Sequence, residues 1–466
     1  MKTIHVKNGY NIRLEGAPEK TTETVARPFQ VAVLPEKIPF IKPRLLVSEG
    51  DAVSVGSHLF EDKRNPKIKF ASPGGGKISR IAFGERRVLQ EIVIDLGEKE
   101  TFLERPAKDA SLIMKTDRSL LIEEMKNGGM WPLIRELPYR DIAKPYKRDD
   151  KGSAVMEIIP PLVMVIIGGN EPFTPCPEMY LKDDMEAFNI GLAVLKKVGS
   201  ERIVIASDPE TAETYLKNMA THVIEGPYAA YDPAVILYYI RKEAEENRAW
   251  YIDGQDVVLI GRFFMTGSFP INRIISISGS HVKRPGHLVI RSGSSISHII
   301  RGRVRKTENK DLRYVSGGVF SGLRTYPKSY MGYYEKNLLV FPEGNTQEAF
   351  GFLKPGYEKP SYSRTFLSVF NNKEMKMDAS LHGGERACVN CGYCAEVCPV
   401  EILPQYTYKS VYAGEIEESL KHGLLDCAEC GLCSYVCTSK IDLRSHLAKA
   451  KAAYYKEQGG LATQVL

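Results

Sequence analysis

The chain has 466 residues, of which 43% are hydrophobic and 26% are charged, and this length indicates about three domains rather than one. The formal net charge of +6 is small and no basic run is interleaved with aromatic residues, so we expect no nucleic-acid partner. No stretch approaches the roughly 18 apolar residues that a membrane-spanning helix needs, and the N-terminus has no signal-peptide core, so we expect an intracellular protein that starts out soluble.

Residues 40–98 consist of short apolar segments separated by tight-turn signals such as Gly50-Asp51. Alternating strands joined by such turns predict a sandwich of hairpins, and the pattern resembles the barrel sandwich of biotinyl and lipoyl domains. We assign residues 1–108 to this β-domain. Lys63 lies near the position at which such domains carry a modified lysine, but its sequence context differs. We therefore expect a packing module without modification.

Residues 109–270 alternate apolar strands with amphipathic helices, which predicts a doubly wound α/β domain. The clearest strands are 162–167 and 202–206, and the clearest helices are 183–198 and 233–245. A ligand of such a domain binds at the carboxyl ends of the strands, which points to Gly168 and Gly169. A lone Gly-Gly pair without a G-x-G-x-x-G motif is a weak signal.

Residues 271–375 turn β-rich again, with strands expected at 273–278, 287–290 and 337–341. We predict a β-grasp or SLBB-like module here. Residues 376–466 form the last predicted domain, which is helical and carries nearly all the cysteines. The fold class is therefore a multidomain α/β protein.

Eight of the nine cysteines lie in this last domain, in two groups with the spacing C-x2-C-x2-C-x3-C. The groups are Cys388, Cys391, Cys394 and Cys398, and Cys427, Cys430, Cys433 and Cys437. This is the spacing of two-cluster bacterial ferredoxins. Zinc sites usually show paired C-x2-C knuckles without the additional cysteines, and crowded cysteines in an intracellular chain favour metal over disulfides. We therefore predict two [4Fe-4S] clusters, and a structural or incidental role for Cys176.

The fourth cysteine of each group begins a segment that leads away from its own loop, so it binds the other cluster. On this rule the metal ligands of the first cluster are Cys388, Cys391, Cys394 and Cys437. Those of the second cluster are Cys427, Cys430, Cys433 and Cys398.

The order of a barrel sandwich, an α/β domain, a β-grasp-like module and a cysteine-rich tail resembles two related protein families. These are the A subunits of the sodium-pumping NADH:quinone oxidoreductase (Nqr) and the C subunits of the Rnf complex, both relatives of the flavin-bearing subunit of respiratory complex I. Residues 129–132 and 135–139 look like the Nqr branch. The cysteine groups look like the Rnf branch, and the resemblance covers nearly the whole chain.

Flavin-binding relatives approach the FMN phosphate with the bare backbone of a glycine-rich loop. The similar place here has bulky Met130 and Trp131 after its glycines, which disfavours such an approach. A motif of these relatives has two acidic residues, and the similar stretch here, residues 169–172, retains only one of them, Glu171. The resemblance thus implies a vestigial flavin or nucleotide site at Gly128, Gly129, Gly168, Gly169 and Glu171. A plain turn residue is the alternative for Glu171, and FMN, NADH and quinone stay open as ligands.

The resemblance implies an electron-transfer subunit of a membrane-bound, ion-translocating NADH:quinone oxidoreductase of the Nqr or Rnf type. Such a subunit lies peripherally on the cytoplasmic face of the cell membrane and has the other subunits of the complex as partners. One alternative is an NADH-oxidising, FMN-binding entry subunit like that of Rnf. The other is a scaffold that binds quinone or docks its neighbours. We find no acid–base pair or nucleophile that indicates a separate reaction by this chain.

Overall fold

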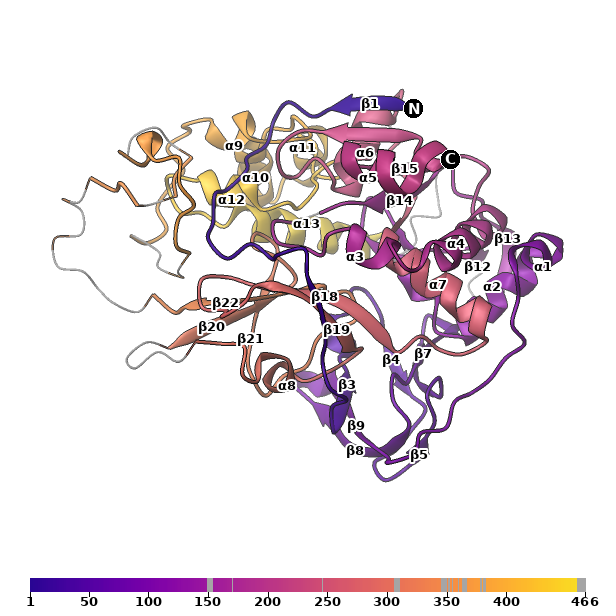
Figure 1. Ribbon diagram of the computed structural model, residues 1–466. Coiled ribbons are helices and arrows are strands. Elements are labelled where there is room, and N and C mark those ends of the chain that lie inside the picture. The colour runs from indigo at the N-terminus through magenta and orange to yellow at the C-terminus, as the bar shows by residue number, and fades with distance from the viewer. Residues whose placement is uncertain are drawn as a thin grey trace.

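A seven-stranded sheet lies at the centre of the α/β domain, in the order β1-β16-β15-β14-β17-β10-β11 (Figure 1). The computed structural model describes residues 1–148, 154–169, 171–244, 246–305, 311–344 and 383–458, together with 350, 353, 355–358, 360–362, 367–377 and 379. The sheet strands are β1 (Lys2–His5), β16 (His222–Glu225), β15 (Ile203–Ser207), β14 (Val163–Ile167), β17 (Trp250–Asp253), β10 (Arg135–Glu136) and β11 (Asp141–Ile142). The first five are parallel, and this confirms the predicted doubly wound domain.

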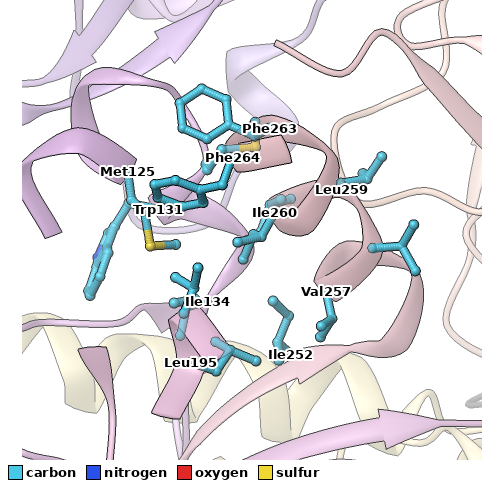
Figure 2. Close-up of a cluster of buried hydrophobic side chains, with 14 of the residues drawn as sticks. Met125, Trp131, Ile134, Leu195, Ile252, Val257, Leu259, Ile260, Phe263 and Phe264 are labelled. Carbon is cyan, nitrogen blue, oxygen red and sulfur yellow. The ribbon is translucent and has the colours of Figure 1, made fainter. Parts of the chain in front are cut away.

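Two long helices cover one face of this sheet, and they pack closely because glycines face the neighbouring backbone. They are α4 (Met185–Val198) and α7 (Gly254–Thr266). A β-carbon on Gly261 of α7 would overlap the carbonyl oxygen of Ala187 in α4. Figure 2 shows the side chains of α7 lying beside Trp131 and Ile134 in one apolar cluster.

Several shorter elements complete the α/β domain. The helices are α1 (Ala110–Lys115), α2 (Arg118–Asn127), α3 (Glu178–Leu181), α5 (Pro209–Thr211) and α6 (Pro233–Ile240). A separate antiparallel hairpin consists of β12 (Tyr146–Arg148) and β13 (Ala154–Glu157). The predicted helix 233–245 ends at Ile240, and residue 245 lies outside the described residues.

The barrel-sandwich domain has two small antiparallel sheets, as predicted. One has the order β3-β9-β8-β5 and the other β4-β6-β7. Their strands are β3 (Gln30–Val33), β4 (Pro43–Leu45), β5 (Ala52–Val53), β6 (His58–Asp62), β7 (Asn65–Ala71), β8 (Gly76–Phe83) and β9 (Leu89–Leu96). Phe60 and Phe70 are cross-strand neighbours, and their rings stack with centroids 4.4 Å apart. Exposed Lys63 lies in the turn between β6 and β7.

The first two strands of the segment assigned to the barrel sandwich pair with strands of other domains. Strand β1 pairs in parallel with β16 in the central sheet, and β2 (Thr22–Thr24) pairs in parallel with β19 (Gly286–Arg291) in the third domain. The barrel sandwich itself therefore begins at β3. Short polar segments such as Thr22–Thr24 are exposed along their whole length, so their sequence carries no hydrophobic pattern that identifies their partner.

The third domain is a six-stranded sheet in the order β2-β19-β18-β22-β20-β21. Its other elements are β18 (Asn272–Ser278), β19 (Gly286–Arg291), α8 (Ile296–Ile300), β20 (Leu312–Ser316), β21 (Leu323–Thr325) and β22 (Asn337–Pro342). Strands β18, β19 and β22 match the three expected strands within one residue at each end. This domain has an apolar core of its own, which includes Ile275, Leu288 and Val340.

The C-terminal module consists of helices packed against the second face of the central sheet (Figure 1). They are α9 (Tyr393–Glu396), α10 (Pro404–Ala413), α11 (Ile416–Lys421), α12 (Leu432–Val436) and α13 (Leu443–Glu457). Residues 459–466 of the predicted domain lie outside the described ones. No helix in the described ranges is long and apolar enough to cross a membrane.

We predict that Gly261→Ala lowers the free energy of unfolding of the α/β domain by about 1–3 kcal/mol, because the added methyl group forces α4 and α7 apart. Urea denaturation followed by tryptophan fluorescence checks this, since both tryptophans, Trp131 and Trp250, are buried in this domain. Gly384→Ala is the control, because nothing lies within 4 Å of a β-carbon there. Equal midpoints for the two variants would contradict the packing argument.

Candidate functional site

Two loops of the C-terminal module each carry three cysteines and follow the same backbone path. In each, a glycine in the left-handed region comes directly before the short helix that carries the third cysteine; these are Gly392 and Gly431, both with φ of 83°. Asn390 and Glu429 occupy equivalent positions and have φ of 55° and 54°. A glycine takes this conformation without steric cost, so the repeated motif produces the same tight loop twice.

The structure brings the eight cysteines together in the crossed sets that the spacing predicts. Cys388, Cys391, Cys394 and Cys437 line one small cavity, which we call the first centre. Cys398, Cys427, Cys430 and Cys433 line another, which we call the second centre. Four thiols around one cavity are the donor set that a [4Fe-4S] cluster requires, so the residues fit such a cluster. Their role as ligands stays a prediction.

The two centres differ in their exposure to solvent. In the first, Cys391 is exposed and the neighbouring Val389 is 69% exposed. In the second, Cys398 and Cys427 are buried. Burial raises the pKa of the Cys398 thiol to about 12, so iron binding there must displace a proton that the free thiol holds at neutral pH.

A cavity of about 460 Å³ lies at the carboxyl ends of the central strands and reaches the second centre. Gly168 follows β14, Asp253 ends β17, and Cys430 belongs to the second centre; all three line the cavity. Its wall also carries aromatic and cationic side chains, including Tyr180, Tyr228, Tyr251, Tyr334, Arg135, Arg140, Lys336 and Arg444. A cavity with polar side chains in its wall therefore lies at the strand ends, where the sequence predicted a ligand.

Glu171 lines this cavity and anchors a loop of the third domain. Its carboxylate accepts hydrogen bonds from the backbone N–H groups of Phe320 and Ser321, both at 2.9 Å. Burial raises the pKa of this carboxyl group despite those two donors. The ring of Phe320 stacks on Tyr228 with centroids 4.8 Å apart. Glu171 thus anchors a loop at the edge of the cavity.

The other predicted glycines lie elsewhere. A β-carbon on Gly128 would overlap the ring of Phe263, and one on Gly129 would crowd Ala71 of the barrel sandwich. The Trp131 indole N–H donates to the Ala143 carbonyl at 2.8 Å within the core. Core side chains therefore fill the space around this turn. Gly169 approaches Thr174 and is not among the described residues that line the cavity.

Charged groups that were not apparent from the sequence join the cavity to the cysteine module. Arg140, in the turn between β10 and β11, donates to both carboxylate oxygens of Asp232 at 2.7 and 2.8 Å. The same nitrogen donates to the Ala428 carbonyl at 2.8 Å. Lys336, which also lines the cavity, lies 2.7 Å from Asp253 and 3.1 Å from Asp256. Nothing in the sequence distinguishes these residues from solvated surface charges.

Family models match four consecutive segments of the chain. Residues 4–97 match the NqrA N-terminal barrel-sandwich hybrid domain, and residues 116–269 match the NqrA second alpha/beta domain. Residues 274–326 match the NQRA C-terminal domain, and residues 386–441 match a 4Fe-4S dicluster domain. The predicted fold class, with its barrel sandwich, α/β domain, SLBB-like module and dicluster tail, is confirmed.

The A subunit of the Na(+)-translocating NADH-quinone reductase from Neisseria meningitidis serogroup B is 32% identical over 423 residues, which are 89% of this chain and 91% of that protein. The chain belongs to the NqrA family. The family member from Yersinia pestis is 30% identical and the one from Histophilus somni 29%, each over 421 residues and with the same shares of both chains. The resemblance predicted from domain order is thereby confirmed.

We predict that Cys398→Ser removes the same electron paramagnetic resonance (EPR) signal as Cys430→Ser, although the two residues lie in different sequence motifs, because both line the second centre. Cys437→Ser should instead behave like Cys391→Ser. Each variant should lose up to about half of the bound iron. Cys176→Ser is the control and should keep both signals. A Cys398→Ser variant that groups with Cys391→Ser would contradict the crossed arrangement.

Proposed function

We propose that this chain is an electron-transfer subunit of a membrane-bound, ion-translocating NADH:quinone oxidoreductase of the Nqr or Rnf type. Membership of the NqrA family and the match to a dicluster domain support this proposal. The observation that carries it is the placement of two four-thiol sets, one near the surface and one against the large cavity. Each would hold a [4Fe-4S] cluster, which would store one electron.

The cysteines also hold the two centres in a fixed relation. Cys398 follows α9, which begins in the first loop, yet it contributes to the second centre. Cys437 follows α12, which begins in the second loop, and contributes to the first centre. Leu432 and Val436 of α12 pack with Val397 in one apolar cluster. Two interlocked loops with a shared core keep the centres at one separation, as a relay requires.

The proposed partners are the other subunits of the complex, and the proposed location is the cytoplasmic face of the cell membrane. The exposed loop around Val389 and Cys391 is the part of the first centre that a partner reaches. The second centre is covered by the α/β domain and reaches the cavity through Cys430. Electrons would therefore cross the module between a partner at the surface and the interior of this chain. The direction of flow stays open.

A second candidate function is the binding of a redox ligand, FMN or quinone, in the cavity. Its volume of about 460 Å³ falls in the range of small-molecule sites. The Tyr251 hydroxyl lines it and has no hydrogen-bond partner among the described residues. A buried hydroxyl without a partner favours a ligand that accepts its hydrogen bond. Flavin or quinone that co-purifies with the chain, and is lost in Tyr251→Phe, would establish this function.

For the purified protein, we predict that dithionite produces two [4Fe-4S] EPR signals and that NADH alone produces none. The reason is that core side chains cover the Gly128–Gly129 turn, which is the place that the sequence resemblance matched to a flavin-binding loop. Anaerobic protein with a measured iron content is the sample, and added catalytic flavoprotein plus NADH is the positive control. Reduction by NADH alone would instead establish this chain as the entry point for electrons. Iron-replete protein without any four-iron signal would refute the relay.

A further inference from the structure

The second cysteine loop has its backbone held from outside by four side chains. The carbonyl of Cys427 accepts from Lys451 Nζ at 2.9 Å, and that of Ala428 accepts from Arg140 Nη2 at 2.8 Å. The carbonyl of Glu429 accepts from Arg444 Nε at 2.8 Å, and that of Cys430 accepts from the Tyr228 hydroxyl at 2.7 Å. Four consecutive carbonyls of the loop thus accept side-chain hydrogen bonds. We call the four donors Lys451, Arg140, Arg444 and Tyr228 the carbonyl clamp.

The first cysteine loop has no such clamp. It has the same spacing and the same left-handed positions, but among the described residues no side chain donates to the carbonyls of residues 388–391. That loop is mostly exposed, so water is available to those groups. The clamp is therefore a property of the second centre alone. Lys451 and Arg444 come from α13 of the module itself, whereas Arg140 comes from the turn between β10 and β11 and Tyr228 from the loop before α6. The clamp is therefore complete only when the module is docked on the α/β domain.

The clamp also brings net positive charge to a buried place. Three of its members are cations, and two carboxylates accompany them. Asp232 pairs with Arg140 at 2.7 Å, and Glu429 pairs with Lys451 at 3.2 Å. The Lys451 side chain is 3% exposed, so water screens its charge little. The Glu429 N–H also faces the centre and donates to the Cys427 sulfur at 3.4 Å.

We propose that the cations of the carbonyl clamp are positioning residues that raise the reduction potential of the second centre. The proposal rests on the proposed function, in which this cysteine set holds a four-iron cluster. With four thiolates, reduction by one electron changes the charge of such a cluster from −2 to −3. Burial opposes this added charge, while nearby cations and oriented N–H groups favour it. In this proposal, burial lowers the reduction potential of the second centre and the clamp cations offset that decrease. The centre beside the cavity therefore stays reducible.

The clamp cations also connect the cavity to the second centre. Arg140, Arg444 and Lys451 all line the cavity as well as holding the loop. Arg140 Nε has no hydrogen-bond partner among the described residues. An anionic group in the cavity would therefore share these cations with the centre and weaken their effect on its potential. The clamp proposal therefore implies that an anion bound in the cavity would lower the reduction potential of the second centre.

Potentiometric EPR titration of full-length, cluster-loaded protein tests the proposal with two variants of opposite sign. Lys451→Gln should lower the midpoint potential of the second centre, with about a tenfold fall in the equilibrium constant for reduction, which is about 59 mV for one electron. Glu429→Gln should raise the same midpoint. Lys449→Gln is the matched control, since Lys449 is an exposed lysine on the same helix, and should leave both midpoints in place. A purely structural role would not give shifts of opposite sign.

The Cys391→Ser background identifies the midpoint that belongs to the second centre, because it removes a thiol of the first centre only. Shifts in the same direction for both variants, equal shifts of both centres, or no shift would overturn the clamp proposal and leave the relay standing. If Lys451→Gln fails to load iron, Arg444→Gln replaces it with the same expectation. Wild-type protein that is iron-replete but lacks four-iron signals would overturn the relay and the clamp together.

Discussion

A parallel sheet must be covered on both faces, because its strands are apolar on both sides, and this constraint determines how the whole chain is built. Helices α4 and α7 cover one face. Of the described helices in the same domain, α6 lies on the other face, and the C-terminal module covers the rest. Cys398, Cys427 and Leu447 belong to the same apolar cluster as Met164 and Ile166 of β14. The cysteine module is therefore part of the core, not a tethered appendage.

This docking places the two cysteine centres in different surroundings although their loops have the same conformation. The second centre is covered on the side that meets the sheet, and the cations that bind its loop come partly from the α/β domain, as Arg140 does. The first centre stays at the surface. The asymmetry between a surface centre and an interior centre follows from where the module docks and not from either loop.

Particular residues show which features could be predicted. The strands at 162–167 and 202–206 were predictable because continuous apolar runs of that length suit a buried parallel sheet, and the structure places β14 and β15 there. Residues 257–260 are a short apolar run that lies in α7, and in runs of this length composition cannot separate a helix from a strand. The partners of β1 and β2 could not be predicted, since their pairing joins residues about 200 or more positions apart.

The sequence by itself determined the domain order, the family and the crossed grouping of eight cysteines, because a repeated local spacing with a glycine at a fixed offset encodes a loop without help from the rest of the fold. Only the tertiary structure decided that Glu171 anchors a loop, that Gly128 and Gly129 pack against core side chains, and that Lys451 is buried beside a cysteine loop. The first two depend on contacts between segments far apart in the chain, and the third depends on how α13 packs beside the cysteine loop. Burial removes water from around a charged side chain such as Lys451 and thereby strengthens its electrostatic interactions. Burial that arises from tertiary packing leaves no pattern in the local sequence.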